Sequence, residues 1–265
     1  MGRQITGFLA SCTVFCAFRW VDLALWTDLS TGLIRNGHVW LRYAALFAWA
    51  AAALATGHLA ADPAGQLARP AGRGATFALS LPAFAASVCF GAQGVLDIIR
   101  AAGPADIVQG ALYAVSALWL ECLGQYWLTA GLGRPGRKAS GPPPAWLGTA
   151  GSLAFVWGVL RSFMTNGSSW QRTIPTSAAW QQLAAVLLLA AVLRAVCLPG
   201  AANPRAAGRY GLLAALLCAA WQLPRCVLLP AGPGDWGLVA LGLLGAGCAL
   251  ACAGETGAKG ARAAD

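Results

Sequence analysis

Charged residues are scarce in this sequence. Only 10% of its 265 residues are Asp, Glu, Lys or Arg, and 58% are hydrophobic. Soluble domains contain about a quarter charged residues, so this composition excludes a soluble protein and indicates one that crosses a membrane several times. The net charge of +9 comes from basic residues at the ends of apolar segments. This distribution favours anionic membrane lipid as a partner and argues against nucleic acid, which would require a basic patch with interleaved aromatic residues.

The residues that build metal centres and catalytic sites are also few. Histidine occurs only at His38 and His58, and none of the nine cysteines stands in a C-x-x-C motif. Zinc and disulfide sites need clustered ligands, so we expect no metal or other cofactor. The sequence has no H-E-x-x-H, no G-x-S-x-G and no phosphate-binding glycine loop, which makes an enzyme acting on lipids the least favoured function.

Long apolar runs dominate what is present. Each is about 18 to 26 residues long, enough to cross a hydrocarbon core of about 30 Å as a helix. The first run lacks a small-residue cleavage site and is expected to be a retained helix instead of a signal peptide. We therefore expect an all-α integral membrane protein with eight transmembrane helices, at about 5–26, 38–59, 75–98, 107–132, 145–165, 177–197, 210–229 and 236–253.

Basic and acidic residues fall on opposite sides of this arrangement. Most Lys and Arg lie beside the segment ends that share a side with the two termini, whereas most Asp residues lie at the other ends. The positive-inside rule then predicts that both termini are cytoplasmic. The polar tail, residues 254–265, is expected to be disordered on that side.

A polar, proline-rich run lies near the midpoint of the chain. It extends from Gly133 to Pro144 and reads G-R-P-G-R-K-A-S-G-P-P-P. We expect it to be a cytoplasmic basic linker between two four-helix halves, residues 1–132 and 145–253.

The two halves share a sequence correspondence. Gln93 stands thirteen residues before Asp106, and Gln222 stands thirteen before Asp235; both stretches end in an A-G-P-x-D turn. Because four spans separate the copies, this predicts a parallel internal repeat, with both halves entering the membrane from the same side. The alternative is that Ala- and Leu-rich helices with Gly-Pro turns resemble one another by chance.

One acidic residue lies deep inside a span. Glu121 is roughly 21 Å along its helix from the outer end, at about 1.5 Å per residue. Ionisable groups at such depth cost several kcal/mol and mark either a functional site or a buried pairing. Gln125 follows on the same face, so the two residues are candidates for proton or ion coupling. Equally, Glu121 has no role in function if it is protonated and hydrogen-bonded to a neighbouring helix.

Arginines form a second candidate site toward the outer ends of the spans. Arg19, Arg161 and Arg225 lie in the last third of the first, fifth and seventh segments. If these helices line the interface of the halves, the arginines form a basic pocket for a carboxylate or phosphate; otherwise each one snorkels or pairs with an acid. Pro224 predicts an interruption of the seventh segment. The remaining candidate ligand-binding residues are Asp97, Gln93 and Gln222.

Two motifs carry a resemblance. Residues 18–33, F-R-W-V-D-L-A-L-W-T-D-L-S-T-G-L, resemble a D-x-x-T-G-F/L signature in the first outer loop of uncharacterised multi-pass membrane proteins from clostridial and related gut bacteria. R-S-F-M-T-N followed by W-Q-Q-L-A-A-V-L-L-L-A-A-V-L-R is similar to the second half of the same group. This sequence has Leu33 where an aromatic residue is commoner. The resemblance implies a bacterial plasma membrane and eight spans, and no mechanism.

Two functions stay open beside the disfavoured enzyme. A carrier or transporter-like protein would bind a small anionic or amphipathic solute at the interface of the halves, with the arginines as counter-ions and Glu121 as the coupling group. A membrane scaffold or sensor-type subunit would instead hold a protein partner through its basic loops and small-residue helix faces. Replacing Glu121 with Gln separates the two, because only the first function depends on its charge.

Overall fold

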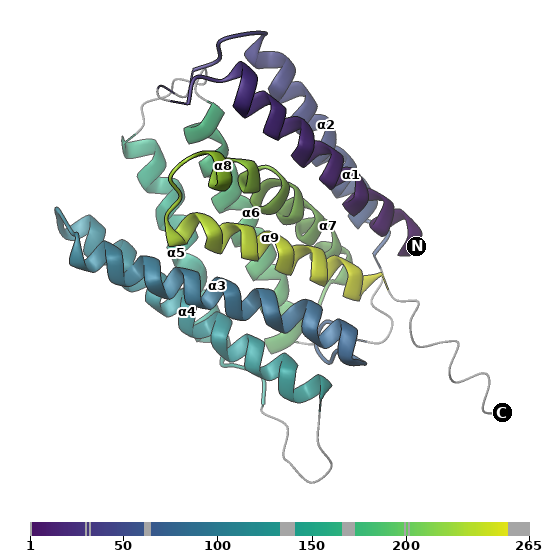
Figure 1. Cartoon of the computed structure of the whole chain (residues 1–265). Helices are drawn as coiled ribbons and strands as arrows, with labels where there is room; N and C mark the ends of the chain where they lie inside the picture. The colour runs from purple at the N-terminus through teal and green to yellow at the C-terminus, as the bar shows by residue number, and fades with distance from the viewer. Residues whose placement is uncertain are drawn as a thin grey trace.

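The chain folds as a bundle of helices. The computed structural model describes residues 2–29, 31, 33–60, 65–132, 141–165, 173–198, 200 and 202–253. Within these residues the secondary structure is helical, apart from turns and an isolated bridge between Thr27 and Ile34. Among the described residues, eight helical stretches are long and apolar enough to cross a membrane, in agreement with the eight spans that the sequence predicts (Figure 1).

Two of the spans are composite. The first joins a regular helix to a π-helical turn, and the seventh joins two helices through a π-helical segment and a break at Trp221. The interruption expected near Pro224 is therefore present. The elements are α1 (Gly2–Val21), η1 (Asp22–Trp26), α2 (Val39–Gly57), α3 (Arg73–Ile99), α4 (Pro104–Gly131), α5 (Ala145–Thr165), α6 (Thr173–Cys197), α7 (Pro204–Ala214), η3 (Ala215–Ala220), α8 (Gln222–Leu228) and α9 (Pro233–Cys252).

Several helices begin earlier than hydropathy predicts, and in α7 a capping residue extends the helix beyond the apolar run. α7 begins at Pro204, six residues before the predicted start. The side chain of Asn203 accepts a hydrogen bond from Ala206 N at 3.1 Å, and Pro204 occupies the first helical position, where its missing N–H costs nothing. Such starts are set by polar residues that a hydropathy window excludes.

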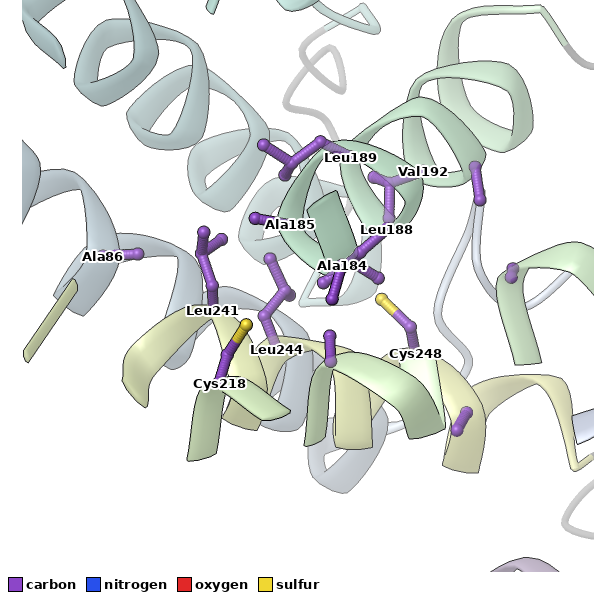
Figure 2. Close-up of a cluster of buried hydrophobic side chains, with 14 of the residues drawn as sticks. Ala86, Ala184, Ala185, Leu188, Leu189, Val192, Cys218, Leu241, Leu244 and Cys248 are labelled. Atoms are coloured by element: carbon purple, nitrogen blue, oxygen red, sulfur yellow. The ribbon is translucent and has the colours of Figure 1, made fainter. Parts of the chain in front are cut away.

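α9 forms the centre of the bundle. It packs against α3 on one side and against α7 and η3 on the other, with α1 and α2 lying outside α7 and η3 (Figure 1). Contacts from α3 through α4, α5, α6 and α7 back to α9 close a ring of helices. Figure 2 shows the core where α6 meets η3 and α9: Leu188, Leu244, Cys218 and Cys248 converge there, and all are fully buried.

The packing joins residues from both predicted halves. α3 lies along α9, α4 contacts α5, and α2 contacts α7. A two-fold relation of the halves would also place α4 along α7, and no extended contact joins that pair in the described part of the chain. The parallel repeat stays a prediction from sequence. Residues 133–140 of the predicted linker and the tail 254–265 lie outside the described residues.

Glycines allow α9 and α7 to approach closely. A methyl group on Gly211 would lie 2.5 Å from the carbonyl oxygen of Gly245, and one on Gly245 would lie 2.5 Å from that of Gly211. Backbone atoms cannot move aside as a side-chain tip can, so a larger residue must push the helices apart. Small residues at such crossings are typical of helices packed in membranes.

This crossing gives a first prediction. Gly211→Ala should lower the thermal stability of the detergent-purified protein, because overpacking costs about 1–3 kcal/mol. Gly7→Ala is the matched control, since a methyl group there meets nothing within 4 Å. Melting followed by size-exclusion chromatography measures the difference, and equal melting temperatures for the two variants would contradict the packing described here.

Candidate functional site

A cavity opens at the end of the bundle where α3 ends and α4 and α9 begin. Its volume is about 380 Å³. A smaller cavity of about 220 Å³ adjoins it and shares the side chains of Gln93 and Asp97. We call the larger one the polar cavity, because most of its lining side chains are polar: Gln93, Asp97, Gln109, Tyr113, Arg161, Ser162, Gln182 and Asp235.

Two aspartates at helix starts hold the arginines of this region. Asp106 and Asp235 are each the third residue of a helix that begins at a Gly-Pro pair, α4 and α9. Each carboxylate accepts a backbone hydrogen bond of 3.0 Å from just before its helix, which satisfies part of the helix end. Asp106 pairs with Arg161 of α5, and Asp235 pairs with Arg225 of α8 at 2.9 Å. Both arginines are thereby neutralised.

Asp97 differs from the other two aspartates. Its Oδ1 accepts a hydrogen bond from Gln93 Nε2 at 2.7 Å, and Asp97 makes no ion pair within the described residues. Gln93 Oε1 in turn accepts from Gly234 N at 3.0 Å, which ties α3 to the start of α9. Asp97 is half-buried in the cavity wall and carries a charge that no described cation balances.

The lining of the polar cavity also includes amide oxygens without partners. Gln109 is only 5% exposed, and its Oε1 makes no hydrogen bond, although its Nε2 donates to Ala154 O at 3.5 Å. Gln182 Oε1 is also buried and unpaired, while its side chain hydrogen-bonds with Tyr113. Buried polar atoms are nearly always satisfied, so these oxygens mark positions where a bound molecule or water donates hydrogen bonds.

Gln222 and Arg225 act on the cavity through Asp235. Gln222 Nε2 donates to Asp235 Oδ1 at 2.9 Å, and Gln181 Nε2 donates to Gln222 Oε1 at 3.0 Å. Gln181 Nε2 also donates to Leu217 O at 3.0 Å. Leu217 lies in η3. In this π-helical turn the backbone N–H of Trp221 donates to the carbonyl oxygen of Leu216 instead of that of Leu217. The irregular turn thus anchors a buried polar chain from α6 to α9.

Arg19 lies in a separate cluster. It pairs with Asp22, three residues later on the same helix face, and its guanidinium stacks on Trp221 at 3.9 Å from the ring centroid. Asp22 Oδ1 also accepts a hydrogen bond from Arg42 Nε at 2.5 Å. The three charged residues are at most 7% exposed. We call Arg19, Asp22 and Arg42 the buried triad; none of its members lines the polar cavity.

Glu121 and Gln125 lie on the surface of α4, away from the polar cavity. Gln125 is exposed, Glu121 is half-buried, and Gln125 Nε2 donates to Glu121 Oε1 at 2.9 Å. Glu121 is fifteen residues beyond Asp106 in α4, about 22 Å along the helix. Its hydrogen-bond partner is therefore its own helix neighbour. Among the described residues, no group of three His, Cys, Asp or Glu is placed to hold a metal ion.

Comparisons with known proteins find no matching family model, no matching curated protein and no matching solved structure. The resemblance to clostridial membrane proteins therefore stays a prediction.

Sequence reasoning placed Gln93, Asp97 and Arg161 among the candidates and missed the rest of the lining. Gln109 and Tyr113 stand four residues apart on α4, a spacing that puts them on one helix face. Gln182 is one of two consecutive glutamines in an otherwise apolar stretch of α6. The sequence contains both signals, but Gln109, Tyr113 and Gln182 are uncharged at neutral pH, and a search for charged groups passes over them.

The buried triad gives a second prediction. Asp22→Asn should lower the melting temperature of the purified protein strongly, because removing one partner of a buried ion pair costs about 3–5 kcal/mol. Arg35→Gln is the control: Arg35 is 66% exposed and lies 3.6 Å from Asp28, and such surface pairs contribute at most about 1 kcal/mol. If both substitutions shift the melting temperature equally, the triad does not stabilise the fold.

Proposed function

We propose that this chain is a carrier-like membrane protein that binds a small polar solute bearing an ammonium group in the polar cavity. One observation carries the proposal: Asp97 contributes an unbalanced carboxylate to the cavity wall. The unpaired oxygens of Gln109 and Gln182, which also line the cavity, add two more acceptors. Three acceptor groups around a cavity of this size suit a ligand rich in N–H donors.

The ion pairs argue for an ammonium group over a carboxylate. The expectation of an anionic solute depended on free guanidinium groups, and Arg161 and Arg225 each face an aspartate. With Asp97 and Arg100, the region holds three carboxylates and three arginines, and Asp97 is the carboxylate with which none of these arginines forms an ion pair. Arg100 lines the smaller adjoining cavity, is exposed at the end of α3, and makes no ion pair with Asp97. A cationic or zwitterionic solute therefore meets a favourable field there.

The membrane setting completes the proposal. With both termini cytoplasmic, as the positive-inside rule predicts, the end of α3 and the starts of α4 and α9 lie outside. The polar cavity then opens outward, and we place the protein in a bacterial plasma membrane. The two helix starts also support an ancient duplication, because Asp106 and Asp235 each hold an arginine from a different helix after the same Gly-Pro turn.

A third prediction tests the ligand class. Putrescine, ethanolamine and glycine, each of which carries an ammonium group with N–H donors, are added to the purified protein and compared with acetate and phosphate by thermal shift. At least one ammonium compound should stabilise the wild type. Asp97→Asn should weaken that binding about tenfold or more, because a hydrogen bond to a charged group contributes about 1.5–3 kcal/mol. Glu121→Gln is the matched control and should bind normally, since Glu121 lies away from the cavity.

A protein that is stabilised by anions alone would contradict this prediction. Stabilisation by acetate or phosphate alone, lost in Arg161→Gln and retained in Asp97→Asn, would overturn the ammonium assignment. It would support the anionic solute instead.

A membrane scaffold is the second candidate, favoured by Glu121 and Gln125. A polar pair on the outer face of a span is costly against lipid, and a partner helix that hydrogen-bonds with it removes that cost. A fourth prediction follows. The double variant Glu121→Leu/Gln125→Leu should lose a co-purifying subunit while keeping solute binding, as native gels and thermal shift would measure. An unchanged complex, or no complex in the wild type, removes the scaffold function.

A further inference from the structure

A second cavity lies on the other side of the molecule, where α1 meets α2. It has a volume of about 310 Å³ and shares no residue with the polar cavity. We call it the α1–α2 cleft. Its walls come from the end of α1, from η1, from the turn before α2 and from the first residues of α2; the residues used below are Phe18, Trp26, Leu41, Arg42 and Ala45.

The buried triad forms the polar end of this cleft and carries an excess positive charge. Arg19 and Arg42 share one carboxylate, that of Asp22, and neither arginine pairs with another acid among the described residues. Two guanidinium groups against one carboxylate leave a net charge of +1 in a region at most 7% exposed. An uncompensated buried charge is costly, so the triad needs a counter-anion.

Arg42 is the member through which an anion can approach. It lines the α1–α2 cleft, whereas Arg19 is stacked on Trp221 in the interior. Arg42 Nε bonds to Asp22, and Nη2 donates to the carbonyl oxygens of Trp26 and Asn36 at 3.5 and 3.1 Å. Its Nη1 is buried and has no hydrogen-bond partner. Arg42 thus brings to the cleft wall a guanidinium with one unused donor, which the side chain must turn to expose when an anion binds.

Apart from Asn36 and His38, the remaining walls of the cleft are apolar and open to the surface. Leu41 is 74% exposed, and Phe18 and Trp26 are also exposed on the outside of the bundle. These residues stand at the ends of spans, where a tryptophan is typical of the interface between hydrocarbon and headgroups. A free inorganic anion would leave this apolar surface uncovered. A molecule with an anionic head and hydrocarbon chains would cover it.

We propose that the α1–α2 cleft binds an anionic phospholipid, with the phosphate beside Arg42 and an acyl chain along Phe18 and Leu41. The lipid supplies the negative charge that the buried triad lacks. A charge-assisted hydrogen bond from guanidinium to phosphate is among the stronger polar contacts in proteins. This site is independent of the solute proposed for the polar cavity.

Native mass spectrometry of the full-length protein in detergent tests the site, with phosphatidylglycerol, phosphatidylcholine and inorganic phosphate as probes. We expect one retained phosphatidylglycerol, about tenfold more abundant than phosphatidylcholine, whose choline cation would sit beside the excess positive charge. Phosphatidylglycerol should also raise the melting temperature, and inorganic phosphate should not. Equal retention of the two lipids, or equal stabilisation by phosphate alone, would overturn the lipid assignment.

A bulky substitution in the cleft tests lipid binding without replacing any residue of the buried triad. Ala45→Trp fills the cleft while all three residues of the buried triad are kept, and should reduce phosphatidylglycerol retention about tenfold in a protein that still elutes as the wild type. Ala44→Trp is the matched control, because Ala44 is exposed on the neighbouring face of α2 and does not line the cleft. Equal retention in these two variants would place the bound lipid elsewhere and overturn the proposal.

Discussion

Ion pairs between arginines and aspartates organise one end of this molecule, where one group is buried and two are partly exposed. Three ion-paired groups each join consecutive spans there: Asp22 with Arg42 links η1 to α2, Asp106 with Arg161 links α4 to α5, and Asp235 with Arg225 links α9 to α8. In a medium of low dielectric, such charges must be paired or hydrogen-bonded. The pairs therefore fix the helix ends relative to one another, and they decide which charged groups remain for a ligand.

The ion pairs leave one charge without a partner in each of the two cavities. Asp97 adds a carboxylate to the polar cavity, and Arg42 adds a guanidinium to the α1–α2 cleft. The helix positions elsewhere come from close packing, because α9 carries glycines where α3, α7 and η3 cross it. A glycine-rich central helix allows other spans to surround it without leaving voids. The polar cavity lies at the start of this central helix, whereas the α1–α2 cleft is lined by residues 18–45.

The sequence predicts the part of this structure that depends on local properties. Span number follows from the length of the apolar runs, and the pairing of arginines with acids was one of two alternatives it left open. Which acid pairs with which arginine depends on packing: Asp106 and Arg161 are 55 residues apart and meet only because α4 lies against α5. Arg42 is not among the candidate site residues that the sequence predicts, because it lies in the opening turn of a span, where arginines commonly face water. The direction in which Glu121 points depends on which face of α4 packs on α3 and α5, and helical periodicity in an Ala- and Leu-rich span does not determine that face.

The central claim is that the polar cavity is open to the outside and takes up solute. Labelling of Ser162→Cys, in a variant that lacks the nine native cysteines, tests it most directly. Ser162 lines the cavity from α5, and Ser152, ten residues earlier on α5, does not line it. A membrane-impermeant maleimide added to intact cells should modify the cysteine at 162 and spare one at 152. Labelling at 162 only after the cytoplasmic side is exposed, or no labelling on either side, would contradict an outward-facing site.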